Sequence, residues 1–183
     1  MRELSLNILD IAQNSISAGA SLITIEVSEN TTDHTVLIGI YDNGKGMSEE
    51  QVKSVIDPFF TTRTTRKVGM GIPLFKMAAE QTGGSLEIKS ELGVGTEVRA
   101  FFKTDSVDFT PLGDVPSTIQ MLITMNTDRD FVYKLTVDGR EFIADTREIK
   151  AILGDVPLDT YEVSQWLLDF IKENTDEIYG GSL

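Results

Sequence analysis

The sequence predicts an α+β fold: a two-layer α/β sandwich in which helices cover one face of a mixed, mostly antiparallel sheet, with a small C-terminal α+β extension. Three observations lead to this fold class. Helical patterns alternate with hairpins rather than forming βαβ units. Polar or glycine-containing turns separate runs that are rich in β-branched residues. The 183 residues are 40% hydrophobic and 25% charged, a composition that can build a buried core.

The elements of the first part follow from periodicity and end signals. Residues 3–19 predict an amphipathic helix, because apolar side chains recur every three or four positions before Gly19. Ser48 opens a capping box with Gln51, which predicts a helix running to about Ile56. A further helix is predicted from Gly71 to about residue 82. Strands are predicted over residues 22–27, 36–41, 85–90 and 96–102.

The second part predicts a smaller α+β unit. Residues 119–125 are predicted as a strand, and residues 131–137 with 141–144 as a hairpin around Asp138-Gly139. Two helices follow, over residues 146–153 and 160–178. Trp166 lies on the apolar stripe of the second of these, so we expect it in the core rather than on a ligand platform.

Charge divides the chain near residue 103. Residues 1–103 hold 10 basic and 13 acidic side chains, whereas residues 104–183 hold 6 and 16. The stretch 104–116 contains two prolines, a glycine and three aspartates, which is typical of a boundary. We therefore predict one unit over 1–103, a linker over 104–116 and an acidic unit over 117–183. The acidity of that last unit is most simply a solvated surface.

Composition also excludes several functions. With 16 basic and 29 acidic side chains the net charge is −13, which argues against a nucleic-acid surface. Cysteine is absent and there is one histidine, so thiolate and His-rich metal sites are excluded. No apolar run approaches the roughly 18 residues of a membrane span. We expect a cytoplasmic protein with no membrane or nucleic-acid partner.

The first candidate site motif is the pair Asp10 and Asn14 on the opening helix. A spacing of four places the two side chains one turn apart on the same face. An amide oxygen is a hard ligand suited to Mg²⁺, and a neighbouring carboxylate can orient or deprotonate an attacking group. The alternative is that both are ordinary polar residues of an amphipathic helix.

The second motif is Asp42-Asn43-Gly44-Lys45-Gly46-Met47, which follows a predicted strand. A carboxylate there can accept a hydrogen bond from an exocyclic amine such as that of adenine. Gly44 and Gly46 permit close approach of the backbone to a ligand. The alternative is a simple turn. The GxxxxGK spacing from Gly39 is not a P-loop, because position 46 is Gly where a P-loop needs Ser or Thr.

The third motif is a basic loop that leads into a helix. Arg63, Arg66 and Lys67 precede Gly69-Met70-Gly71, where the helix is predicted to open. Free N–H groups at a helix start, together with nearby cations, form a phosphate site. The alternative is an exposed basic loop. A fourth stretch, residues 93–96, is by itself only a hairpin turn, but the Thr96 hydroxyl is predicted to assist Asp42.

Together these motifs resemble the ATP-binding domain of the superfamily that contains DNA gyrase, the heat-shock chaperones, histidine kinases and MutL (the Bergerat fold). Over residues 1–103, the stretches 10–20, 42–47, 57–63, 69–74 and 93–96 look like its N box, first glycine box, F box, second glycine box and last glycine box. Residues 59–62 and 69–96 look most like the histidine-kinase branch, and residues 14–20 look like the MutL branch. Asp10 stands where the hydrolytic members place Glu.

The resemblance implies the cofactors ATP and Mg²⁺ and a role for each motif. Asp42 with Thr96 would read adenine, beside the turn of Gly44, Gly46 and Met47. Asn14 would ligate Mg²⁺. Asp10 would position the attacking group. The phosphate tail would be held by Arg66, Lys67, Gly69 and Gly71.

Two functions remain open from the sequence. One is a Mg²⁺–ATP-binding protein, similar to the catalytic domain of histidine kinases, that phosphorylates an unidentified partner protein. The alternative is an ATP-gated interaction module with slow or no hydrolysis. His34 lies in a polar turn between two predicted strands, so we do not expect it to be a phosphoacceptor, nor the chain to be a complete sensor kinase.

Overall fold

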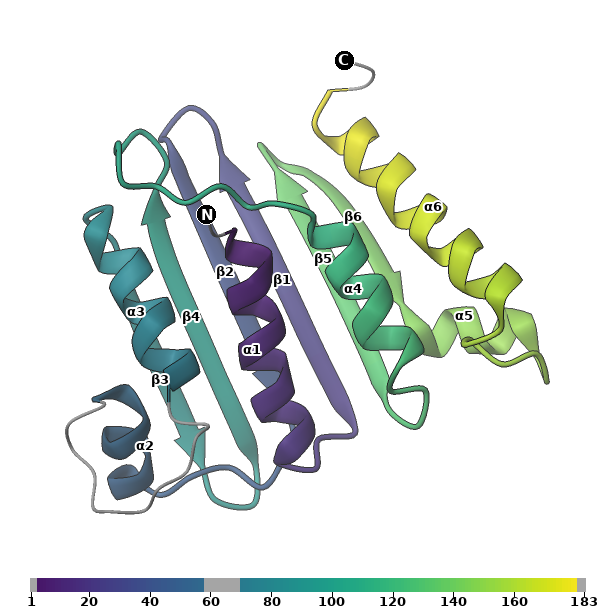
Figure 1. The fold of residues 1–183 in the computed structure, drawn as a ribbon, viewed down its shortest axis with the longest axis horizontal. Helices are drawn as coiled ribbons and strands as arrows, with labels where there is room; N and C mark the ends of the chain where they lie inside the picture. Colours follow the sequence, from purple (N-terminus) through teal and green to yellow (C-terminus); the bar gives the residue numbers. More distant parts are fainter. Residues whose placement is uncertain (1–2, 58–69, 181–183) are drawn as a thin grey trace.

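A computed structural model of the chain describes residues 3–57 and 70–180. Its helices and strands, in chain order, are α1 (Leu4–Ser17), β1 (Leu22–Asn30), β2 (Thr35–Asp42), α2 (Glu49–Ile56), α3 (Gly71–Gln81), β3 (Ser85–Glu91), β4 (Gly95–Lys103), α4 (Val115–Thr124), β5 (Asp130–Val137), β6 (Arg140–Asp145), α5 (Thr146–Leu153) and α6 (Tyr161–Ile178). Helices cover one face of an open sheet, so the predicted two-layer sandwich is confirmed (Figure 1). None of the described helices is long and apolar enough to cross a membrane.

The sheet has six strands in the order β3-β4-β2-β1-β5-β6. Strands β1 and β5 pair in parallel, whereas the other four neighbouring pairs are antiparallel. The C-terminal extension is thus joined to the first part through β1, where Ile25 lies opposite Tyr133. Opposite Ile25 on the other side is Ile40 of β2. The mixed sheet therefore runs through both parts of the chain.

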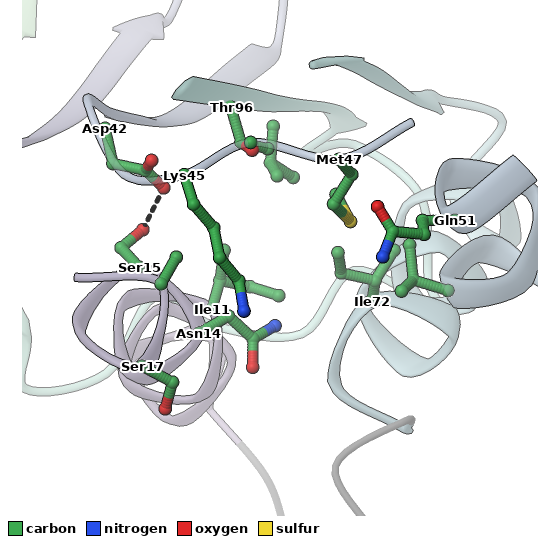
Figure 2. A pocket seen from close by; sticks show the side chains of 14 residues that line it. Ile11, Asn14, Ser15, Ser17, Asp42, Lys45, Met47, Gln51, Ile72 and Thr96 are labelled. Atoms are coloured by element: carbon green, nitrogen blue, oxygen red, sulfur yellow. Dashed lines mark hydrogen bonds between the residues drawn. The ribbon is translucent and has the colours of Figure 1, made fainter. Parts of the chain in front are cut away.

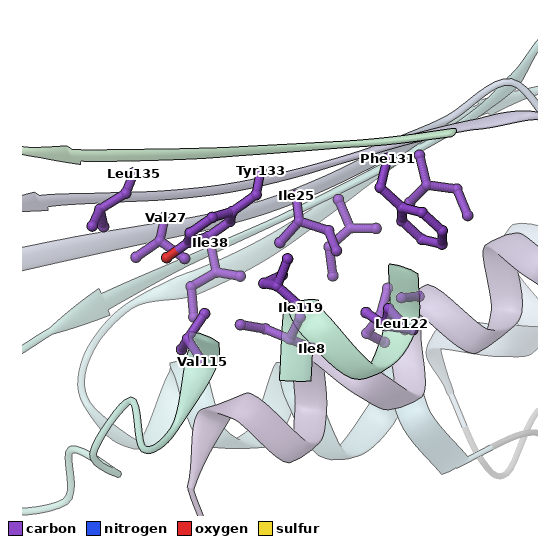
Figure 3. Close-up of a cluster of buried hydrophobic side chains, with 14 of the residues drawn as sticks. Ile8, Ile25, Val27, Ile38, Val115, Ile119, Leu122, Phe131, Tyr133 and Leu135 are labelled. Atoms are coloured by element: carbon purple, nitrogen blue, oxygen red, sulfur yellow. The ribbon is translucent and has the colours of Figure 1, made fainter. Parts of the chain in front are cut away.

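One hydrophobic core lies between this sheet and its helices. Along β1 buried residues alternate with half-buried ones, as expected of a strand with one covered face. Figure 3 shows Ile8 of α1 and Ile119 of α4 below Ile25 and Tyr133 of the sheet, and all four side chains are buried. Burial of such side chains, each worth about 1.5–3 kcal/mol, holds α1 and α4 on the same face.

The segment between β4 and α4 is fastened to the start of α1. The backbone N–H groups of Leu4 and Ser5 donate to the carbonyls of Pro111 and Leu112 at 2.8 and 2.9 Å. These are two of the donors that a helix start leaves without an intrahelical partner. Glu3 accepts the Asp114 N–H at 2.9 Å, so the beginning of the chain and the beginning of α4 are held together.

The prediction of a strand over residues 119–125 is wrong, because this stretch lies in helix α4. The Asp114 carboxylate accepts the Ser117 N–H at 3.1 Å and caps the helix, and Pro116 occupies its first turn. Val115, Ile119 and Leu122 are buried at helical spacing. Asp114 and Pro116, two of the residues that suggested a boundary, are here the start signals of a helix.

The core assignment of Trp166 is also wrong. Its side chain is 47% exposed, whereas the neighbouring Leu167 and Ile171 are fully buried. The apolar stripe of α6 is therefore wider than the face that contacts the sheet. Other local predictions are confirmed: Ser48 and Gln51 form the capping box of α2, and Asp138 and Gly139 make the β5–β6 turn with φ of 50° and 87°.

Candidate functional site

A cavity of about 470 Å³ opens where α1, α2, α3 and the ends of β2 and β4 meet. Figure 2 shows its lining side chains. The polar lining residues are Asn14, Ser15, Ser17, Asp42, Lys45, Gln51 and Thr96, and the others are Ile11, Ala18, Gly46, Met47, Val55, Ile72 and Val98. An apolar cavity of this volume with a few placed polar groups is typical of a small-molecule site.

Asp42 is the most firmly positioned polar group of the cavity. Its Oδ2 accepts the Ser15 hydroxyl at 2.6 Å, and its Oδ1 accepts the Gly44 N–H at 2.8 Å. Ser15 is only 3% exposed and comes from α1, so this bond ties the end of β2 to the helix (Figure 2). Each carboxylate oxygen still has capacity to accept a second donor. The arrangement presents a fixed acceptor to the cavity.

The turn after β2 approaches other backbone so closely that glycine is needed. Gly46 has φ +73°, and a Cβ there would collide with the backbone carbonyl of Glu91. At Gly44 a Cβ would lie 2.8 Å from the Cβ of Ala18. The Lys45 N–H donates to the Ala18 carbonyl at 3.0 Å, and the Lys45 carbonyl accepts the Gly93 N–H at 2.7 Å. The turn is thus held between α1 and the β3–β4 hairpin.

Thr96 lies directly across the β2–β4 ladder from Asp42. The Ser90 hydroxyl connects it to the turn: Ser90 Oγ lies 2.8 Å from Thr96 Oγ1 and accepts the Met47 N–H at 2.8 Å. Met47 and Thr96 are therefore linked through Ser90 and, with Asp42 opposite Thr96 in the ladder, form one wall of the cavity. From the sequence, the Thr96 hydroxyl was predicted to assist Asp42, but its link to Met47 through Ser90 was not predicted.

Asn14 lines the opposite side of the cavity, on α1. Asp10 is exposed on the same helix and is outside the lining. Both lie near the start of α3, since a Cβ built on Gly71 would be 3.6 Å from the Cβ of Asp10 and 3.9 Å from Nδ2 of Asn14. Those are ordinary contact distances, so packing leaves room for a side chain at Gly71.

The structure therefore brings five of the predicted site residues into the cavity wall: Asn14, Asp42, Gly46, Met47 and Thr96. Gly44, Asp10 and Gly71 are adjacent to it. Arg66, Lys67 and Gly69, together with the predicted F-box residues 58–63, lie outside the described residues, so their predicted roles stay predictions. His34 is exposed in the β1–β2 turn, where the sequence placed it.

Four polar lining residues were not predicted as site residues: Ser15, Ser17, Lys45 and Gln51. Lys45 extends across the cavity toward Asn14 and is the cation among the described lining residues (Figure 2). It stands in the motif that runs from Asp42 to Met47, but no role was predicted for it from the sequence. Gln51 was assigned to capping, and its Oε1 does accept the Ser48 N–H at 2.8 Å. Its place in the first turn of α2 also brings it to the cavity.

Within residues 3–57 and 70–180 no group of three acidic or histidine side chains is arranged to hold a metal. A cation in this cavity would need ligands from a bound molecule as well as from the protein. Asn14 offers an amide oxygen, and Asp10 a carboxylate one turn away, which are the hard oxygen ligands that Mg²⁺ accepts. These two side chains supply oxygens of the kind that Mg²⁺ accepts, and a bound ligand would have to complete its coordination.

Comparison with known proteins covers mainly the first part of the chain. Residues 1–106 match the family model described as histidine kinase-, DNA gyrase B-, and HSP90-like ATPase. Two similar proteins are a putative sensor protein of Shewanella frigidimarina, 29% identical over 103 residues, and the sensor protein SrrB of Staphylococcus aureus, 37% identical over 101 residues. These alignments cover 56% and 52% of this chain, and 15% and 17% of the relatives.

Similar solved structures extend further along the chain. The Aquifex aeolicus MutL ATPase domain complexed with ADP matches with a TM-score of 0.53 and 16% identity, covering 84% of this chain and 69% of that one. The N-terminal domain of a DNA repair protein matches with a TM-score of 0.59 and 13% identity, covering 85% and 58%. Residues 1–106 alone cannot supply this coverage, so the shared fold includes part of the C-terminal extension.

Proposed function

Because the chain belongs to the histidine kinase-, DNA gyrase B-, and HSP90-like ATPase family, we propose that it binds Mg²⁺–ATP in the α1–α2–β4 cavity and transfers the terminal phosphoryl group to a partner protein. The observation that carries this proposal is the convergence of Asp42 and Asn14, from separate elements, on one cavity of about 470 Å³. We also propose a cytoplasmic location, where ATP is available.

The adenine end of the proposed site is the wall formed by Asp42, Met47 and Thr96. The exocyclic amine would donate to Asp42, whose carboxylate is already fixed by Ser15 and Gly44. Fixing an acceptor before the ligand arrives lowers the entropy cost of binding. Apolar lining side chains such as Met47 and Val98 would cover the purine faces.

The phosphate end would lie near Asn14. Asn14 would hold Mg²⁺ together with the phosphates, and bound Mg²⁺ neutralises their negative charge. Lys45 would add a further positive charge at the phosphates, because its side chain extends toward Asn14. Gly71, with Arg66, Lys67 and Gly69, would complete the phosphate contacts through N–H groups and cations at the start of α3.

Asp10 is the proposed group that positions the nucleophile. It lies one helical turn from Asn14, and both side chains are near Gly71. Phosphoryl transfer depends mainly on positioning and charge neutralisation, so no covalent residue of this chain is required. The recipient would be a nucleophilic side chain of the partner.

Two measurements test this proposal. Calorimetry with ATP at millimolar Mg²⁺ should show saturable binding that the Asp42→Asn variant weakens. Terminally labelled ATP, incubated with the chain and candidate partner proteins, should leave label on a partner. Asp10→Asn should then lose transfer while keeping ATP affinity, and Gln13→Asn, an exposed neighbour on α1, serves as the matched control.

A second candidate is an ATP-gated interaction module that hydrolyses slowly or not at all. The position of Asp10 favours it, because that carboxylate is exposed and outside the cavity lining. In this case ATP binding would persist, Asp10→Asn would change nothing, and no label would reach a partner. The Asp10→Asn variant and the label-transfer assay thus distinguish the two candidate functions.

A further inference from the structure

A second cavity, of about 400 Å³, lies between α5 and α6 and is almost entirely apolar. These helices are at the β6 side of the sheet, away from α2 and the proposed nucleotide site (Figure 1). The groove, as we call this cavity, is lined by Ile149, Ile152, Leu153, Glu162, Val163 and Trp166. Ile152 is 85% exposed although it is an isoleucine. Large apolar side chains that gather in an exposed hollow mark a contact surface.

The aromatic wall of the groove is supported by ring contacts. The Trp166 ring stacks on Phe170 with centroids 5.0 Å apart and an interplanar angle of 10°. Phe170 in turn meets Phe142 of β6 edge-on at 5.4 Å. A tryptophan that is fixed before binding loses little conformational freedom when a partner covers it, and tryptophan is enriched among residues that dominate binding energy.

The groove helices and their connection carry acidic side chains, three of which we call the acidic rim. Asp155 and Asp159 are exposed in the connection between α5 and α6, and Glu162 lines the groove itself. Within the described part of the chain none of these three forms an ion pair. The two cations of α5 are already engaged, because Arg147 pairs with Asp145 and Lys150 with Asp130. The negative charge around the groove is therefore uncompensated.

We propose that this groove binds the apolar face of a basic amphipathic helix that belongs to a partner protein. Its apolar walls come from side chains one turn apart on two helices, a spacing that matches an apolar stripe recurring every three or four residues. The acidic rim would attract Lys or Arg flanking that stripe.

The same charges disfavour the other occupants. A second copy of this chain would bring its own acidic rim and a net charge of −13, so the two surfaces would repel. An anionic lipid surface and a nucleic acid would be repelled for the same reason. A basic amphipathic helix is complementary to both the apolar walls and the acidic rim of the groove.

The sole tryptophan of the chain provides the readout, since Trp166 lines the groove. The probe is an 18-residue peptide of Leu and Lys with Leu at amphipathic helical spacing. Without nucleotide, it should change Trp166 emission saturably, and rising salt should weaken the effect. Two controls share its length: a scrambled Leu/Lys peptide and a Leu/Glu peptide with the original spacing. Neither should bind comparably.

Two variants locate the contact. Ile152→Ser should weaken the peptide about tenfold or more, because it removes a largely exposed apolar side chain that binding would bury. Val107→Ser, which removes a 98% exposed side chain outside the groove, is its matched control and should leave affinity unchanged. Glu162→Lys should weaken binding about threefold or more, whereas Asp105→Asn in the β4–α4 connection should not.

Several results would overturn the proposal. These are unchanged emission with the Leu/Lys peptide, equal binding of either control peptide, or equal affinity of the Ile152→Ser variant. Concentration-dependent emission without peptide, together with a dimer in sedimentation that Ile152→Ser abolishes, would assign the groove to a second copy instead. None of these measurements uses ATP, so their failure is distinct from failure of the proposed nucleotide site.

Discussion

Replacing Asp42 by Asn is the sharpest test of the proposed adenine site, because the amide keeps the shape of the carboxylate and changes its chemistry. In the native chain the Gly44 N–H donates to the Asp42 carboxylate at 2.8 Å. The Asn oxygen can still accept this hydrogen bond. The Asn amino group can donate to Ser15 Oγ, whose hydroxyl can accept as well as donate. A hydrogen bond to each internal partner can thus be kept, so we expect the variant to fold.

The expected loss of ATP affinity follows from the loss of one hydrogen bond, the one that the adenine amine would donate to the Asp42 carboxylate. The carboxylate presents a charged acceptor to the adenine amine, whereas the Asn amino group directs a donor at that amine. A hydrogen bond to a charged group is worth about 1.5–3 kcal/mol. The dissociation constant of Mg²⁺–ATP should therefore rise roughly 10- to 150-fold.

Comparison of two nucleotides makes this test specific. ITP carries an oxygen where ATP carries the exocyclic amine, so the native chain should bind ITP more weakly than ATP. In the Asp42→Asn variant the amino group can donate to that oxygen, and the preference should shrink or reverse. Calorimetry with both nucleotides measures it, with Asp105→Asn as the control. An unchanged ratio of the two affinities in a folded Asp42→Asn variant would refute the reasoning.

Three further predictions follow from the described contacts. Asn14→Ala should weaken ATP about tenfold in Mg²⁺ but little in EDTA, with Gln13→Ala unchanged, as measured by calorimetry. Gly46→Ala should lower the melting temperature more than Gly93→Ala, because both have positive φ (73° and 80°) but only Gly46 also abuts backbone. In thermal melts the Gly93→Ala variant reports the cost of positive φ alone, about 1–2 kcal/mol, and the additional loss in Gly46→Ala reports the steric clash with backbone. Hydrogen bonds from the Ser117 hydroxyl and then its N–H hold the pKa of Asp114 below its usual value. Its stabilisation is therefore complete above the unfolded value of about 3.9 and lost as the pH falls through the lower folded value. Asp114→Ala should cost about 0.5–2 kcal/mol of unfolding free energy at pH 7 and progressively less below pH 4, as measured by denaturant titration beside Asp105→Ala.

The sequence was most informative where the interactions are local. The capping box of Ser48 and Gln51 and the Asp138-Gly139 turn each depend on residues within a few positions, and both are confirmed. Whether an individual side chain is buried or exposed was harder to predict. Trp166 shares its stripe with Leu167, yet one is half exposed and the other buried, because the width of the contact between α6 and the sheet is set by tertiary packing.

Part of the cavity was also predictable from local interactions. Asn14 and Asp42 stand in short motifs whose backbone geometry is local, and both line the cavity. Lys45 could not be assigned from its type, since a lysine between glycines is usually a solvated turn residue. Its inclusion depends on the turn being held between Ala18 and Gly93, contacts that lie far away in sequence.

The error over residues 119–125 has a topological explanation, which depends on a strand pairing that the sequence did not reveal. Strand β4 runs antiparallel to β2, which runs antiparallel to β1, so β4 and β1 point the same way. Strand β5 is parallel to β1 and hence to β4. Successive parallel strands need a crossover that returns the chain to the starting edge, and that crossover is usually a helix. Once β5 is known to pair with β1, the stretch between β4 and β5 is required to supply this crossover, and α4 is what the Asp114 cap and Pro116 specify locally. The local signals and the topology agree, and only the pairing of β1 with β5, across more than 100 residues of sequence, was hidden.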